Sequence, residues 1–326
     1  MAVVRFEAIS QRFGEFFALN DVSASFESTK IHAILGENGA GKSTLMKVLF
    51  GLQKPTAGRI EVDGTARKWK SPADAIAAGL GMVQQHFTLV PTLSVIDNIM
   101  LGAESLSSFG RLDRNAAIIA LEKKLPSESL RLDWHKLVSE LSVGEQQRVE
   151  ILKLIARDAK IMVLDEPTAV LTPSEIEELF HILQRLRDSG RTIFVITHKL
   201  AEVFSFCDTW LALRAGRVGG TGPIEGTELS QVVRAMVGTD VPSLRERAAR
   251  KPGEVFLKVH DVRTDDAHGV NLRGFNIVVR AGEVVGIAGV DGSGQAELID
   301  CILGLRTFSG DVSVGGRSVR FGETRD

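Results

Sequence analysis

The sequence predicts an α/β fold in which an open sheet carries a phosphate-binding loop. Three short segments, 31–35, 161–164 and 192–198, have the apolar composition of buried strands, and polar residues follow or end each of them. The first strand leads through a glycine-rich loop into a helix-like stretch. Since ligands of open α/β sheets bind at the carboxyl ends of the strands, we expect the functional site there.

The composition is that of a globular protein with about two domains. The chain has 326 residues, of which 44% are hydrophobic and 25% charged. Its net charge of −2 implies no general affinity for nucleic acid. No apolar run approaches the roughly 20 residues needed to cross a bilayer, and the first ten residues lack the features of a secretion signal. We therefore expect a cytoplasmic chain. The two cysteines, Cys207 and Cys301, fit no metal-ligand pattern.

The loop that follows the first strand, 36–44, has the sequence GENGAGKST and fits the pattern for triphosphate binding. Its glycines permit backbone angles that turn successive N–H groups toward an anion. Lys42 would bring a positive charge to the β and γ phosphates at a helix N-terminus, and Ser43 would offer a hydroxyl to Mg²⁺. A glycine-rich turn that fits by chance is the alternative. The predicted nucleotide-binding residues are Gly36, Glu37, Asn38, Gly39, Ala40, Gly41, Lys42, Ser43 and Thr44.

Two residues outside the loop are candidates for nucleotide or metal contact. Phe13 lies between strand-like segments 3–10 and 22–26, where an aromatic ring could stack on a base, although by itself it reads more readily as a core residue. Gln85 follows a strand-like segment, and its side-chain oxygen could reach Mg²⁺ or an attacking water. A solvent-facing amide is the alternative for Gln85.

Residues from about 86 to 157 have helical periodicity and predict a helical insertion in the α/β domain. The segments 94–102, 113–125 and 144–157 each place apolar residues at helical intervals. The third segment follows Ser142, a predicted N-cap, and Gly144 leaves the start of that helix open to an anion.

Three titratable residues end the later strands. Asp165 and Glu166 are adjacent, so their side chains should point in different directions and serve different purposes. Asp165 is suited to hold Mg²⁺, and Glu166 to orient and deprotonate a water for attack on the γ phosphate. His198 could hydrogen-bond the γ phosphate or that water. Two solvated acids and a structural histidine are the alternative.

Taken together, these motifs resemble the ATP-binding cassette (ABC) family over residues 3–237, in that family's order and spacing. The resemblance identifies 36–44 as the Walker A loop and Gln85 as the Q-loop residue. It identifies LSVGE, 141–145, as the signature, 161–166 as the Walker B strand with its catalytic glutamate, and His198 as the switch histidine. Phe13 then falls at the family's adenine platform, which reverses the preference for the core.

The resemblance implies bound ATP and Mg²⁺, with Glu166, His198 and Gln85 as catalytic residues and Ser43, Gln85 and Asp165 at the metal. Signature residues Ser142, Gly144 and Glu145 would contact a nucleotide held by another cassette. Two departures from the family pattern concern this inter-cassette contact. LSVGE replaces the commoner LSGGQ, and Thr172 stands where an Asp often helps couple the two sites.

The opening pattern returns with an offset of 253 residues after a polar linker, 240–253. In this repeat Gln295, Ala296 and Glu297 replace Lys42, Ser43 and Thr44, so we expect weak ATP binding there or none. The sequence therefore predicts an ABC domain over 1–239, with an antiparallel β subdomain and the helical insertion, and an incomplete, degenerate second ABC domain over 254–326. Without flanking strands for its glycine loop, that second domain is expected to be loosely folded or to belong to a longer protein.

The resemblance implies the ATPase subunit of a bacterial importer for a simple sugar or nucleoside, peripheral on the inner face of the cell membrane. Its partners would be membrane permease subunits, a second cassette from a homodimer or from the rest of the chain, and indirectly a solute-binding protein, but not nucleic acid. Residues 86, 87 and 89 would face the permease or, equally, pack internally. A non-transport ABC ATPase, a nucleotide-gated regulatory module and an inactive product are the alternatives.

Overall fold

The computed structural model describes residues 2–85, 87–104, 112–125, 130, 132–238, 253–266, 270–289 and 292–322. The chain divides into two compact units, Met1–Val241 and Pro242–Asp326, which are described separately. The domain limits expected at residues 239 and 254 stay a prediction. The α/β class predicted from the sequence is confirmed in the first unit.

A six-stranded sheet with the order β10-β9-β3-β8-β7-β6 forms the centre of the first unit. Its strands are parallel except β10, which lies antiparallel to β9 at one edge. Every residue of β3, β7 and β8 is buried, which explains why these segments are almost continuously apolar. The bounds are β3 Ile31–Leu35, β6 Leu80–Val83, β7 Ile161–Asp165, β8 Thr192–Ile196, β9 Thr209–Arg214 and β10 Arg217–Pro223.

A four-stranded antiparallel sheet, β2-β1-β4-β5, accompanies the central sheet. Its first two strands are longer than the sequence predicts, because they meet in a tight hairpin turn at Gly14, which has a φ of 60°. The register shifts within this pair, including one around Ala8 (φ 50°), interrupt the alternation of apolar residues by which strands are recognised. The bounds are β1 Ala2–Phe13, β2 Phe16–Glu27, β4 Ala57–Val62 and β5 Thr65–Arg67.

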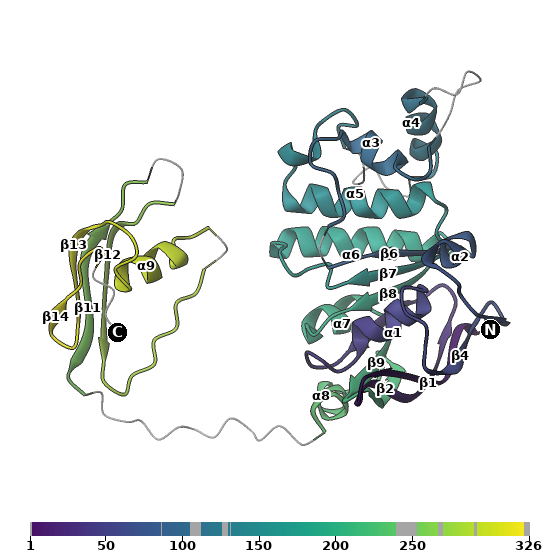
Figure 1. The fold of residues 1–326 in the computed structure, drawn as a ribbon, viewed down its shortest axis with the longest axis horizontal. Helices are drawn as coiled ribbons and strands as arrows, with labels where there is room; N and C mark the ends of the chain where they lie inside the picture. Colours follow the sequence, from purple (N-terminus) through teal and green to yellow (C-terminus); the bar gives the residue numbers. More distant parts are fainter. Residues whose placement is uncertain are drawn as a thin grey trace. The chain divides into compact units, whose positions relative to one another are not determined.

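Helices cover both faces of the central sheet (Figure 1). Helix α1 packs in one apolar core with residues of both sheets. Helices α5, α6 and α7 contribute to a second core with β3, β7 and β8. These two cores fix the strand ends that carry the polar residues. The helices outside the insertion are α1 Lys42–Leu49, α2 Pro72–Ala77, α6 Pro173–Asp188, α7 Leu200–Phe206 and α8 Leu229–Val237.

The expected helical stretch between residues 86 and 157 contains α3 (Val95–Met100), α4 (Arg114–Glu122) and α5 (Val143–Ala156), with a short 3₁₀ helix at Val138–Glu140. Helix α3 contacts both α4 and α5, and the three form a layer at one end of the unit (Figure 1). His86 lies outside the described residues, and Leu89 is partly buried and packs against a core to which α5 contributes. No helix within the described ranges is long and apolar enough to span a bilayer.

The second unit repeats the antiparallel sheet with the order β12-β11-β13-β14 and adds one helix, α9. A small core of its own joins the sheet to α9. Segment 284–288 corresponds to β3 by the offset of 253 residues, but it forms no strand, and Val284 is 87% exposed. Its counterpart β3 pairs with β8 and β9, and no such strands exist in the described part of this unit. The bounds are β11 Val255–Arg263, β12 Arg273–Arg280, α9 Gln295–Ile302, β13 Ser309–Val314 and β14 Arg317–Ser318.

Candidate functional site

The glycine loop runs from the end of β3 to the start of α1 and needs glycine at two positions. Gly36 has a φ of 147°, and a Cβ there would collide with the carbonyl oxygen of Leu213. Gly41 has a φ of 102°, and a Cβ would lie 2.5 Å from the carbonyl oxygen of Ala18. Both the backbone angles and the close approach exclude larger residues. The loop is therefore held by β9 and β2 as well as by its own sequence.

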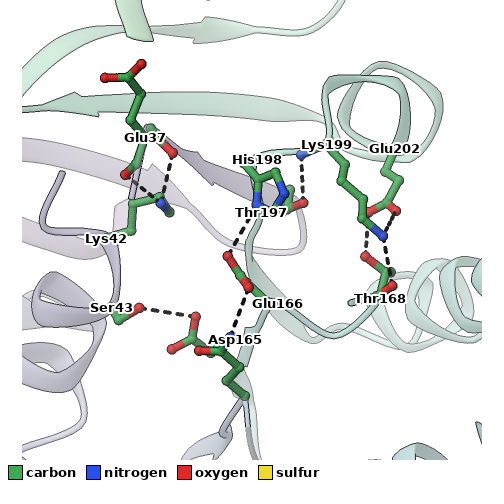
Figure 2. A network of polar contacts seen from close by, with 12 residues as sticks. Glu37, Lys42, Ser43, Asp165, Glu166, Thr168, Thr197, His198, Lys199 and Glu202 are labelled. Carbon is green, nitrogen blue, oxygen red and sulfur yellow. Dashed lines mark hydrogen bonds and ion pairs between the residues drawn. The ribbon is translucent and has the colours of Figure 1, made fainter. Parts of the chain in front are cut away.

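Lys42 begins α1 and folds back over this loop. Its Nζ donates hydrogen bonds to the carbonyl oxygens of Gly36 (2.8 Å) and Glu37 (3.0 Å), as Figure 2 shows. Burial lowers the pKa of the ammonium, and the carboxylates of Glu166 and Asp165 oppose that effect. The arrangement places a cation inside the curve of the loop, where an anion's charge would be compensated.

Ser43 and Asp165 bring two oxygen donors together next to Lys42. The Ser43 hydroxyl donates to Oδ1 of Asp165 at 3.3 Å. Asp165 is only 6% exposed at the end of β7. Burial raises the pKa of its carboxyl group, Ser43 opposes this by hydrogen bonding, and the charge of Glu166 adds to it. A carboxylate that is costly to ionise in the absence of a cation suits a metal ligand.

Glu166 lies between Gln85 and His198. Gln85 Nε2 donates to Oε2 of Glu166 at 3.2 Å, and Nδ1 of His198 lies 3.3 Å from Oε1 (Figure 2). The three residues come from the ends of β6, β7 and β8, which are neighbours in the sheet. Glu166 has a left-handed φ of 48°, and such strain in a non-glycine residue often accompanies function. Asp165 and Glu166 contact different partners, but strand alternation is not the reason, because β7 ends at Asp165 and Glu166 has left-handed backbone angles.

A hollow of about 520 Å³ unites most of the predicted residues. It is lined by the loop from Asn38 to Thr44, together with Phe13, Gln85 and Glu166. Phe13 is 48% exposed, so it is not a core residue. Phe16, which was not predicted from the sequence, lines the same hollow and is 64% exposed. The sequence feature that could have indicated Phe16 is the cluster of phenylalanines around the Gly14 turn, which is an unusual composition for a hairpin turn.

The signature residues are not among the described residues that line this hollow. Ser142 caps α5, and its Oγ accepts a hydrogen bond from the Glu145 amide at 3.2 Å. Glu145 returns the bond, since its Oε2 accepts from the Ser142 amide at 2.8 Å. Gly144 is buried beside them. The chain thus presents a capped helix N-terminus apart from its own hollow.

The repeated glycine loop in the second unit matches the first at the start of its helix but not in its side chains. Gly289, the counterpart of Gly36, does not share the positive φ of 147°. Gly294 precedes α9 with a φ of 98°, close to the 102° of Gly41. The amide Nε2 of Gln295 lies over Gly289, just as the ammonium of Lys42 lies against Gly36. A neutral amide therefore occupies the place of the cation. In addition, the 253-residue offset puts Asp266, paired with Arg306, where the first unit has Phe13.

The chain is similar in sequence to a known protein family and to characterised import proteins. Residues 19–169 match the family described as ABC transporter. The nucleoside import ATP-binding protein NupA of Lactococcus lactis subsp. cremoris is 40% identical over 319 residues, 97% of this chain and 63% of that protein. The guanosine import ATP-binding protein NupO of Bacillus subtilis is 42% identical over 320 residues, 98% of this chain and 62% of that protein. The chain thus spans less than two thirds of the length of these relatives.

A solved structure shares the fold of the first unit. It is a crystal structure of the ADP conformation of an ATP-binding cassette of an ABC transporter, and it is similar with a TM-score of 0.62 and 27% sequence identity. The match covers 73% of this chain and 100% of that one. The fold class predicted from the sequence, a nucleotide-binding cassette with a helical insertion, is confirmed.

Proposed function

Because this chain belongs to the ABC transporter family through its first domain, we propose that it is the ATP-hydrolysing subunit of an importer. The observation that carries the proposal is the position of Glu166, which touches Gln85 and His198 at the rim of a hollow lined by the glycine loop. In this role Glu166 accepts a proton from water, while His198 and Gln85 fix the direction of its carboxylate. Lys42 and the loop amides hold the phosphates.

The residues near the loop fit Mg²⁺ by the chemistry of their donors. The Ser43 hydroxyl, the Asp165 carboxylate and the side-chain oxygen of Gln85 are hard oxygen ligands, and Mg²⁺ prefers few of these together with phosphate oxygens. When bound, the ion neutralises charge that develops on the β and γ phosphates. Asp165 and Ser43 already lie within hydrogen-bond distance, so binding requires only small movements of these two side chains.

The ATP-binding site in the hollow would be completed by Ser142, Gly144 and Glu145 of a second cassette, since these residues do not line the hollow of their own chain. That cassette would come from a second copy or from further sequence of the same protein. The domain would act on permease subunits at the inner face of the membrane. A solute-binding protein would deliver the solute to those subunits. The names of the relatives, which include nucleoside, guanosine and ribose import proteins, support a simple sugar or nucleoside as the solute.

Steady-state ATP hydrolysis by Glu166→Gln tests the proposal. We expect at least about a hundredfold loss of kcat, because the amide cannot accept the proton, with ATP affinity within about twofold of the original. Glu61→Gln is the matched control, since it makes the same chemical change on β4 of the other sheet. Unchanged hydrolysis in Glu166→Gln would show that the general-base assignment is wrong.

A further inference from the structure

Thr168, Lys199 and Glu202 form a polar network that the proposed chemistry does not use, in which Thr168 and Glu202 are buried and Lys199 is partly exposed. The Thr168 hydroxyl donates to Oε2 of Glu202 at 2.9 Å. Lys199 Nζ donates to the backbone oxygen of Thr168 at 2.8 Å and lies 3.3 Å from Oε1 of Glu202. Figure 2 shows the three side chains beside the Glu166 and His198 pair.

The network joins the two loops that carry the reacting side chains. Thr168 follows Glu166 by two residues on the loop after β7, and Lys199 directly follows His198 at the start of α7. Backbone bonds already hold the strand ends, with the Glu166 amide donating to Ile196 at 3.0 Å. The side-chain network fastens the loops beyond that point, where β7 and β8 no longer pair.

Two residues of the network are buried, so their polar groups need partners within the protein. Thr168 is 1% exposed and Glu202 is 7% exposed. A buried carboxylate is tolerated only with hydrogen-bonding or charged partners, so displacement of either loop would leave Glu202 unsatisfied. The contacts therefore favour a single placement of the two loops relative to each other.

We propose that Thr168, Lys199 and Glu202 are positioning residues that hold Glu166 and His198 in contact. This inference rests on the proposed function, because the contact it maintains is the proposed catalytic one. A shift of a few tenths of an ångström in either loop would lengthen the 3.3 Å distance between His198 Nδ1 and Glu166 Oε1. Such a change should lower turnover more than nucleotide affinity, because the glycine loop and Lys42, to which the phosphates are assigned, take no part in the network.

Two substitutions of Thr168 separate hydrogen bonding from packing. Thr168→Val removes the hydroxyl with little change of volume, whereas Thr168→Ser keeps the hydroxyl and removes a methyl group. We expect Thr168→Val to lower kcat at least about tenfold with KM for ATP within about twofold, and Thr168→Ser to stay within about twofold of the original in both. If Thr168 only filled space, Thr168→Ser would be the poorer enzyme, and that order would overturn the proposal.

Glu202 provides a second test. Glu202→Ala should lower kcat as much as Thr168→Val, and the double variant should be no worse than either one, since both break the same network. Glu202→Gln keeps an oxygen for Thr168 and should lose less activity, which preserves the test if Glu202→Ala does not fold. Independent, multiplying losses would overturn the proposal.

Hydrogen exchange of the nucleotide-free chain separates this inference from the proposed function. If the unsubstituted chain hydrolyses no ATP, the proposed function is wrong. The rate of amide hydrogen exchange in segments 166–171 and 197–206 then tests whether the network holds the two loops. Thr168→Val and Glu202→Ala should then exchange at least about fivefold faster there, and Thr168→Ser should not. Equal exchange in all variants would overturn the network's role.

Discussion

The carboxylate of Glu175 lies directly against the backbone of Gly144, so that a Cβ on this glycine would come within 2.5 Å of Oε1. Glu175 is fixed there by a capping box at the start of α6, in which its Oε2 accepts from the amide of Thr172 at 2.9 Å and from its hydroxyl at 2.8 Å. These two bonds keep the pKa of Glu175 below its ordinary value. A larger residue at position 144 would therefore have to displace this capping carboxylate, independently of any contact with a partner cassette.

Gly144→Ala should therefore destabilise the first unit by about 1 kcal/mol, because the methyl group displaces the Glu175 carboxylate from its helix cap. Glu175→Ala should cost about 1 kcal/mol as the loss of a helix cap, and the double variant should recover about 1 kcal/mol of the sum. Urea unfolding followed by tryptophan fluorescence measures this, because Trp69, Trp134 and Trp210 all lie in the first unit. Strictly additive losses would mean that the two residues are not coupled.

Phe13→Leu and Phe16→Leu should each weaken ATP binding about tenfold, because a ring stacked on a base contributes roughly 1–3 kcal/mol. Phe17→Leu is the matched control. Its ring is 43% exposed and lies 5.5 Å from the guanidinium of Arg12, but it is not among the residues that line the hollow. Titration with a fluorescent ATP analogue measures the affinities, and equal weakening in all three variants would contradict a specific platform.

Lys42→Met should weaken ATP binding at least about tenfold, since a charged hydrogen bond contributes about 1.5–3 kcal/mol. Calorimetric titration of the unsubstituted chain should show a single ATP per chain, and Lys42→Met should remove it. Gln295→Met is the control, because it alters the corresponding position of the second unit. Two bound nucleotides, or a loss in the control, would show that the second loop is competent.

His32 should make the first unit sensitive to mild acid. Burial lowers its pKa from 6.5 to about 4, and the neutral ring is held by Thr209 Oγ1 at 2.6 Å and the Glu27 carbonyl at 2.8 Å. The unfolded chain takes up a proton below pH 6.5 and the folded chain does not. Stability is therefore unaffected above pH 6.5 and falls as the pH drops toward 4, by about 2 kcal/mol between pH 6.5 and 5.

His32→Gln should abolish that part of the pH dependence. Urea unfolding at pH 6.5 and at pH 5, followed by tryptophan fluorescence, gives the difference between the two proteins. If the original protein and His32→Gln lost the same free energy over this interval, another group would be responsible.

The sequence was informative wherever chemistry is encoded locally. The glycine loop, the apolar strands and the acids at and directly after the end of β7 all follow from short patterns, and α1 begins at Lys42 as expected. Contacts between distant residues were not predictable in this way. The bond between Thr168 and Glu202 spans 34 residues, and the collision between Gly144 and Glu175 depends on how α5 lies against α6.

The second unit shows the same division between local and distant determinants. Segment 284–288 has the apolar sequence of a strand, yet it pairs with nothing in the described part of its unit, because a strand needs neighbours that local sequence does not supply. Helix α9, whose hydrogen bonds are internal, forms at the position of α1. Secondary structure was thus predictable for the helix and not for the isolated strand.

Gly294 and Gly41 adopt nearly the same φ before helices of equal length, although only one of them precedes a lysine. The main-chain conformation at a helix start therefore does not depend on the charge of the side chain that follows it. At these two glycines the φ angle alone does not distinguish the loop that carries Lys42 from its repeat, whereas the charge of the next residue does. The second unit thus provides, within one protein, a similar helix start that lacks the positive charge.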